Sequence, residues 1–143
     1  GEGESSYVST LKDFVQKSAI QDIVRFVGGV YNEEKWELYR SVDFFVLPTY
    51  CENFGYVIAE ALATGTPVIT TQETPWKALE EYHCGHWVSL SIETVTDAID
   101  DMIGKNSKEL ECMGKSARRL IEMRCNSATV AQSMTELYNK ILQ

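Results

Sequence analysis

The stretch CENFGYVIAEALATGTPVITT, residues 51–71, begins as a loop, continues as a helix and ends as a short strand. Its helical part, residues 54–65, ends at Gly65, a residue type that commonly follows the last turn of a helix. Residues 66–71 favour a strand. Glu60 lies within the helical part among mostly apolar neighbours. A carboxylate in such surroundings is costly unless something binds it.

Helices and strands are expected to alternate on both sides of this stretch. The predicted helices are 5–18, 32–42, 54–65, 75–85, 93–105, 107–123 and 126–142, and the predicted strands are 23–27, 43–48, 66–71 and 86–90. This order predicts an α/β protein, a Rossmann-like doubly wound parallel sheet covered on both faces, with a helical C-terminus. Residues 1–143 are expected to form one domain. Since only about four strands are predicted, we expect the first strands of the sheet to lie outside this chain.

Composition narrows the function classes. The chain has 143 residues, of which 44% are hydrophobic and 24% charged, and its net charge is −8. This charge argues against broad affinity for nucleic acids, which would need a basic face. No apolar run approaches the ~20 residues of a membrane-spanning helix, and the start shows no signal-peptide pattern. The four cysteines lack CxxC spacing, so a reduced cytosolic setting is expected.

The loop at residues 49–53 is the first candidate site, because ligands of parallel α/β sheets bind beyond the carboxyl ends of the strands. The helix that opens at Phe54 and Gly55 offers free N–H groups and a positive dipole end, which suit a phosphate. Glu52 could accept hydrogen bonds from hydroxyls, and Glu60 could accept both hydroxyls of a ribose, since a carboxylate only accepts. The alternative, that both acids are solvated surface residues, stays open at this point.

The sequence of residues 48–71 resembles the donor-site signature of retaining glycosyltransferases of the GT-B fold, family 4 (group 1). That signature has the form P-[ST]-x-x-E-x-F-G-x-x-x-x-E-A-x-A-x-G-x-P-V-I-x-[ST]. The matching residues are Pro48, Thr49, Glu52, Phe54, Gly55, Glu60, Ala61, Ala63, Gly65, Pro67, Val68 and Ile69. The segments on either side are similar to those of members that build lipopolysaccharide and other bacterial surface polysaccharides.

The resemblance implies that the chain is the C-terminal, nucleotide-sugar-binding half of a two-domain enzyme. It assigns Glu52 a catalytic role, holding hydroxyls of the donor sugar, and Glu60 the ribose hydroxyls. The other implied donor contacts are the backbone amides of Asn53, Phe54 and Gly55, the side chain of Val57 beside the ribose, and the strand end at Phe26, Val27 and Gly28 beside the base. Members need neither a metal nor a cofactor, and the nucleotide-sugar is the donor substrate.

The implied reaction is retaining, hexosyl-type transfer from a nucleotide-diphosphate sugar to a polysaccharide or lipid-linked acceptor. The implied partners are the donor, an N-terminal acceptor domain, and the membrane or a lipid-linked acceptor at the inner face of the cytoplasmic membrane. The family's basic pair that grips the diphosphate has no counterpart here, so the chain alone is expected to be inactive. Two alternatives remain: a non-catalytic nucleotide-binding module, and a GT-B nucleotide-sugar epimerase, which should lack the E-x7-E pair.

Three further features have plainer interpretations. The spacing of His83, Cys84 and His86 does not fit the usual zinc sites, so no metal is expected there. The basic residues Lys115, Arg118, Arg119 and Arg124 indicate a solvated helix face, with anionic lipid headgroups as the alternative partner. The tryptophans are expected mainly in the core or at a domain boundary, although Trp76 could face the cleft near the acceptor.

Overall fold

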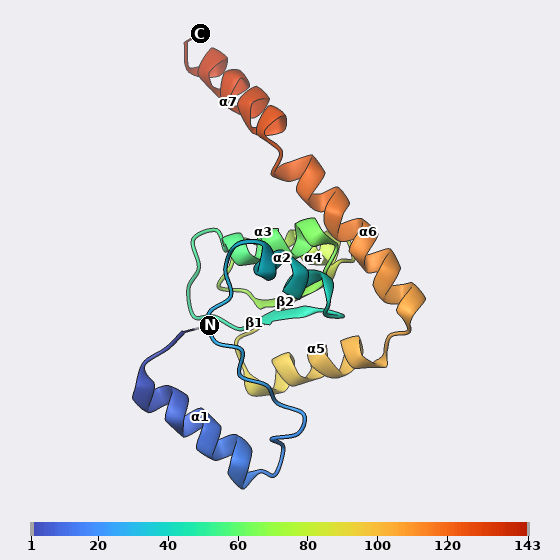
Figure 1. Cartoon of the computed structure of the whole chain (residues 1–143). Coiled ribbons are helices and arrows are strands. Elements are labelled where there is room, and N and C mark those ends of the chain that lie inside the picture. The colour runs from blue at the N-terminus through green and yellow to red at the C-terminus, as the bar shows by residue number, and fades with distance from the viewer. Residues whose placement is uncertain (1, 143) are drawn as a thin grey trace. The chain divides into compact units, whose positions relative to one another are not determined.

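The computed structural model describes residues 2–142 and divides into two compact units, one up to Lys35 and one from Trp36 onward. The helices are α1 (Ser5–Lys17), α2 (Asn32–Arg40), α3 (Tyr56–Thr64), α4 (Ala78–Glu81), α5 (Ile92–Gly104), α6 (Ser107–Arg124) and α7 (Ser127–Ile141). The strands are β1 (Phe45–Leu47), β2 (Val68–Thr71) and β3 (Gly85–Val88), as Figure 1 shows. Each of these elements overlaps its predicted range, although α4 is shorter than the helix predicted over residues 75–85, and Gly85 belongs to β3.

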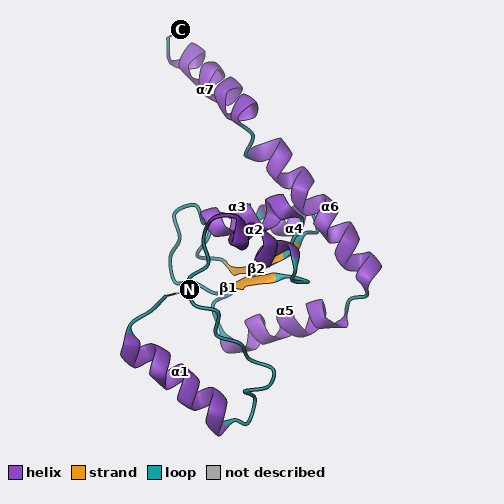
Figure 2. Ribbon diagram, viewed as in Figure 1, coloured by secondary structure: helices purple, strands orange, loops and turns teal. Residues whose placement is uncertain are grey.

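The first unit contains α1 and an irregular segment, and here one prediction is wrong. Residues 23–27 were expected to form a strand, but they form a turn followed by loop, drawn in teal between α1 and α2 in Figure 2. Ile23 is 82% exposed. A strand is held by hydrogen bonds and packing from its neighbours in a sheet. These residues are apolar and β-branched enough for a strand, but they are not part of the sheet.

The second unit is built on a three-stranded parallel sheet with the order β1-β2-β3. β2 is central and pairs with both neighbours, so that Ile69 lies between Val46 and His86. All four residues of β2 are buried. A parallel sheet needs cover on both faces, and the predicted α/β layout is confirmed by this arrangement.

The two faces of β2 supply two cores, because successive side chains of a strand point in opposite directions. Val68 packs into a cluster with buried residues of α3, α4 and α6, among them Ile58, Leu79 and Leu120. Ile69 packs into a second cluster with buried residues of α5. Figure 1 shows α5 on one side of the sheet and α3 with α4 on the other.

The end of α3 is fixed against α6. Gly65 follows the last turn with φ 85°, a left-handed conformation that glycine adopts without steric cost, as predicted. The carbonyl of Thr64 accepts a 2.9 Å hydrogen bond from Arg118 Nη2 of α6. A cation at the carboxyl end of a helix also interacts favourably with the helix dipole. α3 is therefore held at its carboxyl end, while its amino end opens toward the loop at residues 49–55.

Candidate functional site

Threonines of β2 position the loop that follows β1. Thr70 Oγ1 donates to the Leu47 carbonyl at 2.9 Å. Thr71 Oγ1 donates to the Thr49 carbonyl at 2.7 Å and accepts from the Thr49 N–H at 3.2 Å. The first bond joins the last paired residues of β1 and β2, and the two bonds of Thr71 extend the contact by one residue beyond them. The loop therefore leaves the carboxyl edge of the sheet at a defined position.

Glu52 lies where this loop turns toward α3. Its N–H donates to the Glu73 carbonyl at 3.3 Å, and its side chain is half-buried. A Cβ built on Gly55 would lie 3.2 Å from Glu52 Cγ, 3.3 Å from Trp76 Nε1 and 2.9 Å from Ile58 Cδ1. Gly55 has φ 76°, which an L side chain rarely adopts. A glycine here thus brings Glu52 and Trp76 to the amino end of α3.

Phe54 is held between two aromatic rings. Its ring centroid lies 5.0 Å from that of Tyr56 and 5.5 Å from that of Trp76. The Trp76 indole N–H donates to the Phe54 carbonyl. Trp76 is only 5% exposed, so the interpretation that it faces an acceptor cleft is wrong. The physical reason is that the apolar ring is more stable packed behind the loop, where its N–H also finds a partner.

Glu60 has an aromatic partner that the sequence did not reveal. The Tyr39 hydroxyl of α2 donates to Glu60 Oε2 at 3.5 Å, a long hydrogen bond. Burial, followed by the charge of Glu60 and this hydrogen bond, raises the pKa of Tyr39 to about 12. The phenol therefore stays protonated and keeps its donor. The carboxylate that lies among apolar neighbours in the sequence is half-buried and contacted by a hydroxyl.

The remaining predicted donor residues fall into two groups. Asn53 is exposed in the loop, and Val57 is partly exposed in the first turn of α3. Val27 and Gly28 belong to the first unit, in the irregular segment that was expected to be a strand. Gly28 there has φ 70°. The second unit by itself therefore brings Glu52, Phe54 and Gly55 together at the amino end of α3, with Val57 and Glu60 further along that helix.

Sequence reasoning missed Tyr39 and the position of Trp76. The only available signal for Tyr39 was the spacing of Trp36 and Tyr39, which places both on one face of the predicted helix. That spacing says that Tyr39 packs, but not that its hydroxyl reaches an acid 21 positions later. Trp76 had no periodic signal, because it lies in a short connection before α4.

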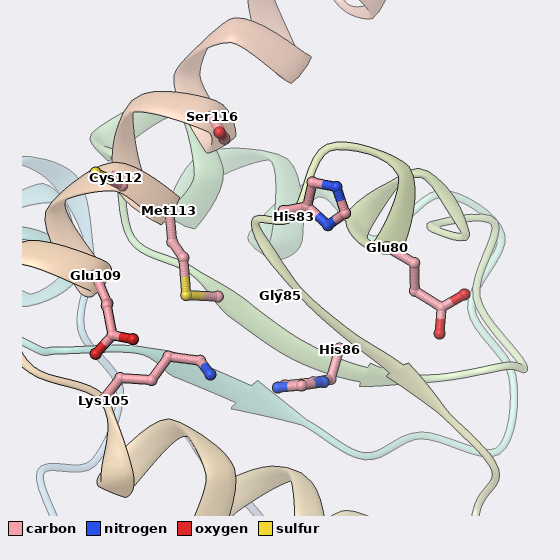
Figure 3. A pocket seen from close by; sticks show the side chains of 9 residues that line it. All are labelled: Glu80, His83, Gly85, His86, Lys105, Glu109, Cys112, Met113 and Ser116. Atoms are coloured by element: carbon pink, nitrogen blue, oxygen red, sulfur yellow. The ribbon is translucent and has the colours of Figure 1, made fainter.

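A separate pocket of about 520 Å³ lies at the amino end of β3. Its lining residues, shown in Figure 3, are Glu80, His83, Gly85, His86, Lys105, Glu109, Cys112, Met113 and Ser116. Asp101 Oδ2 lies 2.8 Å from both His86 Nε2 and Lys105 Nζ. The Lys105 hydrogen bond, with the contact to His86, lowers the pKa of Asp101. Glu109 accepts the Asn106 N–H in the capping box of α6. Most of the charges here thus serve local structure.

Three basic residues of α6 have partners within the chain. Arg118 caps α3, Arg124 Nη2 lies 2.9 Å from Glu81 Oε2, and Lys115 Nζ lies 2.6 Å from Glu111 Oε1. These contacts favour the solvated helix face over a lipid-binding patch. Within residues 2–142, no helix is both long enough and apolar enough to cross a membrane.

Two solved structures share the fold of this chain. Anabaena HepE in complex with UDP and glucose aligns with 96% of the chain at a TM-score of 0.76 and 20% identity, and the chain covers 38% of it. WaaG, a glycosyltransferase involved in lipopolysaccharide biosynthesis, aligns with 87% at a TM-score of 0.72 and 20% identity, with 34% of it covered. At such identities the likeness shows the fold, the Rossmann-like half of a GT-B architecture.

Sequence relatives are similar over the central part of the chain. The lipopolysaccharide core biosynthesis mannosyltransferase LpsB of Rhizobium meliloti is 42% identical over 66 residues, 46% of this chain and 18% of that protein. The mannosylfructose-phosphate synthase of Agrobacterium fabrum is 39% identical over 70 residues, 49% of this chain and 15% of that protein. The aligned part of the chain thus covers less than a fifth of the length of either relative. The model of the family described as glycosyl transferases group 1 matches residues 2–120, and the chain belongs to this family.

Proposed function

We propose that this chain holds the nucleotide-diphosphate sugar of a retaining glycosyltransferase, which transfers the sugar to a polysaccharide or lipid-linked acceptor. Membership of the group 1 family supports a glycosyltransferase. Structural neighbours in complex with UDP and UDP-glucose support a donor of this type. We propose the retaining course, the hexosyl donor and the acceptor in addition to what family membership supports. The activity is assigned to a longer protein, since the chain covers about a third of each of these neighbours.

The observation that carries the proposal is the amino end of α3. This helix starts where the loop after β1 ends, and Glu52 lies beside its first residues. The first N–H groups of a helix have no acceptor within the helix, and the helix dipole adds positive potential there. These groups would stabilise a diphosphate without a metal ion, as the resemblance to the family implies. Glu52 would then accept hydrogen bonds from the hydroxyls of the sugar.

Glu60 would accept the ribose hydroxyls. It lies five positions after Gly55, about 7.5 Å along the helix axis at 1.5 Å per residue. A nucleoside diphosphate laid along α3 would place its phosphates at Gly55 and its ribose near Val57 and Glu60. The Tyr39 hydroxyl at Glu60 Oε2 would hold the carboxylate in one orientation. A carboxylate that is oriented before binding loses less conformational freedom when the ligand arrives.

An NMR titration of the ¹⁵N-labelled chain with UDP, GDP and ADP tests the donor site. We expect one nucleotide to shift the amide resonances of residues 54–60, with affinity near the millimolar range, about −4 kcal/mol. Glu60→Ala should abolish these shifts, whereas Glu111→Ala should not. Glu111 is the matched control, an exposed acid on α6 paired with Lys115. If no nucleotide shifts residues 54–60 and the whole protein is equally silent, the donor-site proposal is wrong.

An activity assay on the whole protein tests the catalytic part. Glu52→Gln keeps the size of the side chain but removes its charge. We expect a loss of about 10²-fold in kcat, as for other single hydrogen bonds that act on the transition state. The configuration of the product at the anomeric carbon, measured by NMR, tests retention directly. A variant that transfers sugar at the wild-type rate would contradict the role of Glu52.

A further inference from the structure

Trp76 contacts the donor loop by its indole N–H and its ring. The N–H donates to the Phe54 carbonyl, and the ring lies 5.5 Å from that of Phe54. The side chain belongs to the core cluster that also contains Ile58 of α3. Trp76 is therefore fixed from behind by the core, and the loop carbonyl is fixed by Trp76.

A bond to the Phe54 carbonyl also determines the direction of the next N–H. The peptide between Phe54 and Gly55 is trans. In a planar trans peptide the C=O and the following N–H point in opposite directions. Because the Phe54 C=O points at the buried indole, the Gly55 N–H points away from it.

The other side of Gly55 is anchored as well. The Gly55 carbonyl accepts hydrogen bonds from the N–H groups of Ile58 at 2.9 Å and Ala59 at 3.2 Å. With both flanking carbonyls bonded, Gly55 is held at φ 76° and ψ 63°. Its N–H is thereby held in one direction at the start of α3.

We infer that Trp76 is a positioning residue of the donor site, which aims the Gly55 N–H at the diphosphate by holding the Phe54 carbonyl. The inference rests on the proposed function and adds a residue to it. Trp76 does not touch the ligand. It lowers the freedom of one peptide group before the ligand binds, which strengthens a hydrogen bond to a charged oxygen.

The ligand-free chain provides the first test. Replacing Trp76 by β-benzothienylalanine keeps the ring shape but removes the N–H. We expect the NMR order parameter of the Gly55 amide to fall from a rigid value of about 0.85 toward about 0.6. The same replacement at Trp87 is the matched control, since its indole N–H also donates to a backbone carbonyl, that of Thr74 at 3.0 Å. An unchanged Gly55 amide in the Trp76 variant overturns the inference.

The second test compares UDP with uridine, which lacks the diphosphate, or GDP or ADP with its own nucleoside where the titration selects that nucleotide. Loss of one net hydrogen bond of about 1 kcal/mol should weaken UDP binding about fivefold. Uridine binding should be unchanged, and the Trp87 control should bind both as the wild type does. Equal weakening of UDP and uridine shows a general structural role and overturns the inference, as does unchanged UDP binding.

The results separate this inference from the proposed function. If the wild-type chain binds UDP at residues 54–60 and the Trp76 variant binds it equally well, only the inference about Trp76 is wrong. If the wild-type chain and the whole protein bind none of UDP, GDP and ADP there, the donor site is wrong, and the Gly55 N–H has no diphosphate to bind. Trp76→Phe, which also removes the N–H but leaves a smaller ring, repeats both comparisons with a natural residue.

Discussion

At the scale of single residues, Tyr39 combines a packing role with a polar one. Its ring meets Phe45 edge-on at 5.5 Å, and its carbonyl accepts the Thr66 hydroxyl at 2.8 Å. Its own hydroxyl donates to Glu60. Because the ring and the backbone are held independently of the hydroxyl, the polar role can be removed without removing the packing.

The raised pKa of Tyr39 predicts a change of stability at high pH. The ordinary pKa of 10.0 rises to about 12 in the folded chain. Between these values the unfolded chain loses the proton while the folded chain keeps it, so the free energy of unfolding falls as pH rises. We expect urea unfolding at pH about 9 and about 11.5 to show a larger loss for the wild type than for Tyr39→Phe, by about 2 kcal/mol. Parallel losses would contradict this assignment.

Cys84 and Cys51 should differ in reactivity. Cys84 is fully buried in the core, and burial raises the pKa of its thiol to about 12. Cys51 is exposed in the loop that carries Glu52. Since the thiolate is the reactive form, an aromatic disulfide reagent at neutral pH should modify Cys51 rapidly and Cys84 only after denaturation. Cys84→Ser should leave the number of fast-reacting thiols unchanged, and a reduced number would contradict the burial of Cys84.

At the scale of elements, Gly114 allows α6 to lie close to the end of α3. A Cβ built on Gly114 of α6 would overlap the carbonyl oxygen of Gly65, which follows α3. Gly104, the last residue of α5, has nothing within 4 Å of such a Cβ. The two helical glycines therefore differ in their surroundings, although both are helix-disfavouring by about 1 kcal/mol relative to alanine.

Alanine substitutions at Gly114 and Gly104 should change the free energy of unfolding differently. Gly114→Ala should lower the free energy of unfolding by about 1–3 kcal/mol, because overpacking outweighs the gain in helix propensity. Gly104→Ala should be neutral or stabilising by up to about 1 kcal/mol. Urea denaturation of both variants measures the difference. If Gly114→Ala is as stable as the wild type, the close approach of α6 to Gly65 is wrong.

At the scale of the whole molecule, the two units differ in burial. Within residues 2–35 no side chain is buried, and α1 exposes Tyr7 and Phe14. The second unit contains both core clusters and the fully buried strand β2. Since the free energy of local opening follows buried contacts, the two units should open independently and at different cost.

Hydrogen exchange measured by mass spectrometry should show this difference. We expect peptides from α1 to exchange orders of magnitude faster than peptides from β2 and the buried face of α3. Addition of urea below the unfolding midpoint should accelerate the exchange of β2, which needs global opening, more than that of α1, which opens locally. Slow exchange of α1, equal to that of β2, would mean that the chain opens as one cooperative unit.

The sequence alone determined the order of the elements and the fold class, because helical and strand periodicities and glycine positions are local properties. It also predicted that Glu52 lies in the loop before one helix, with Phe54 and Gly55 at the start of that helix and Glu60 further along it, since their spacing is short. Residues 23–27, by contrast, were predicted to form a strand and form a turn and loop. Their side chains have the composition of a strand, but strand formation depends on neighbours that composition does not encode.

Only the tertiary structure decided which side chains support that helix. Tyr39 reaches Glu60 and Trp76 reaches Phe54 across separations of 21 and 22 residues. Neither contact follows from a period of two or 3.6 residues, because each depends on how α2 and the connection before α4 pack against α3. The sequence therefore determined where the candidate donor residues lie, and packing determined the direction in which the Glu60 carboxylate and the Phe54–Gly55 peptide are held.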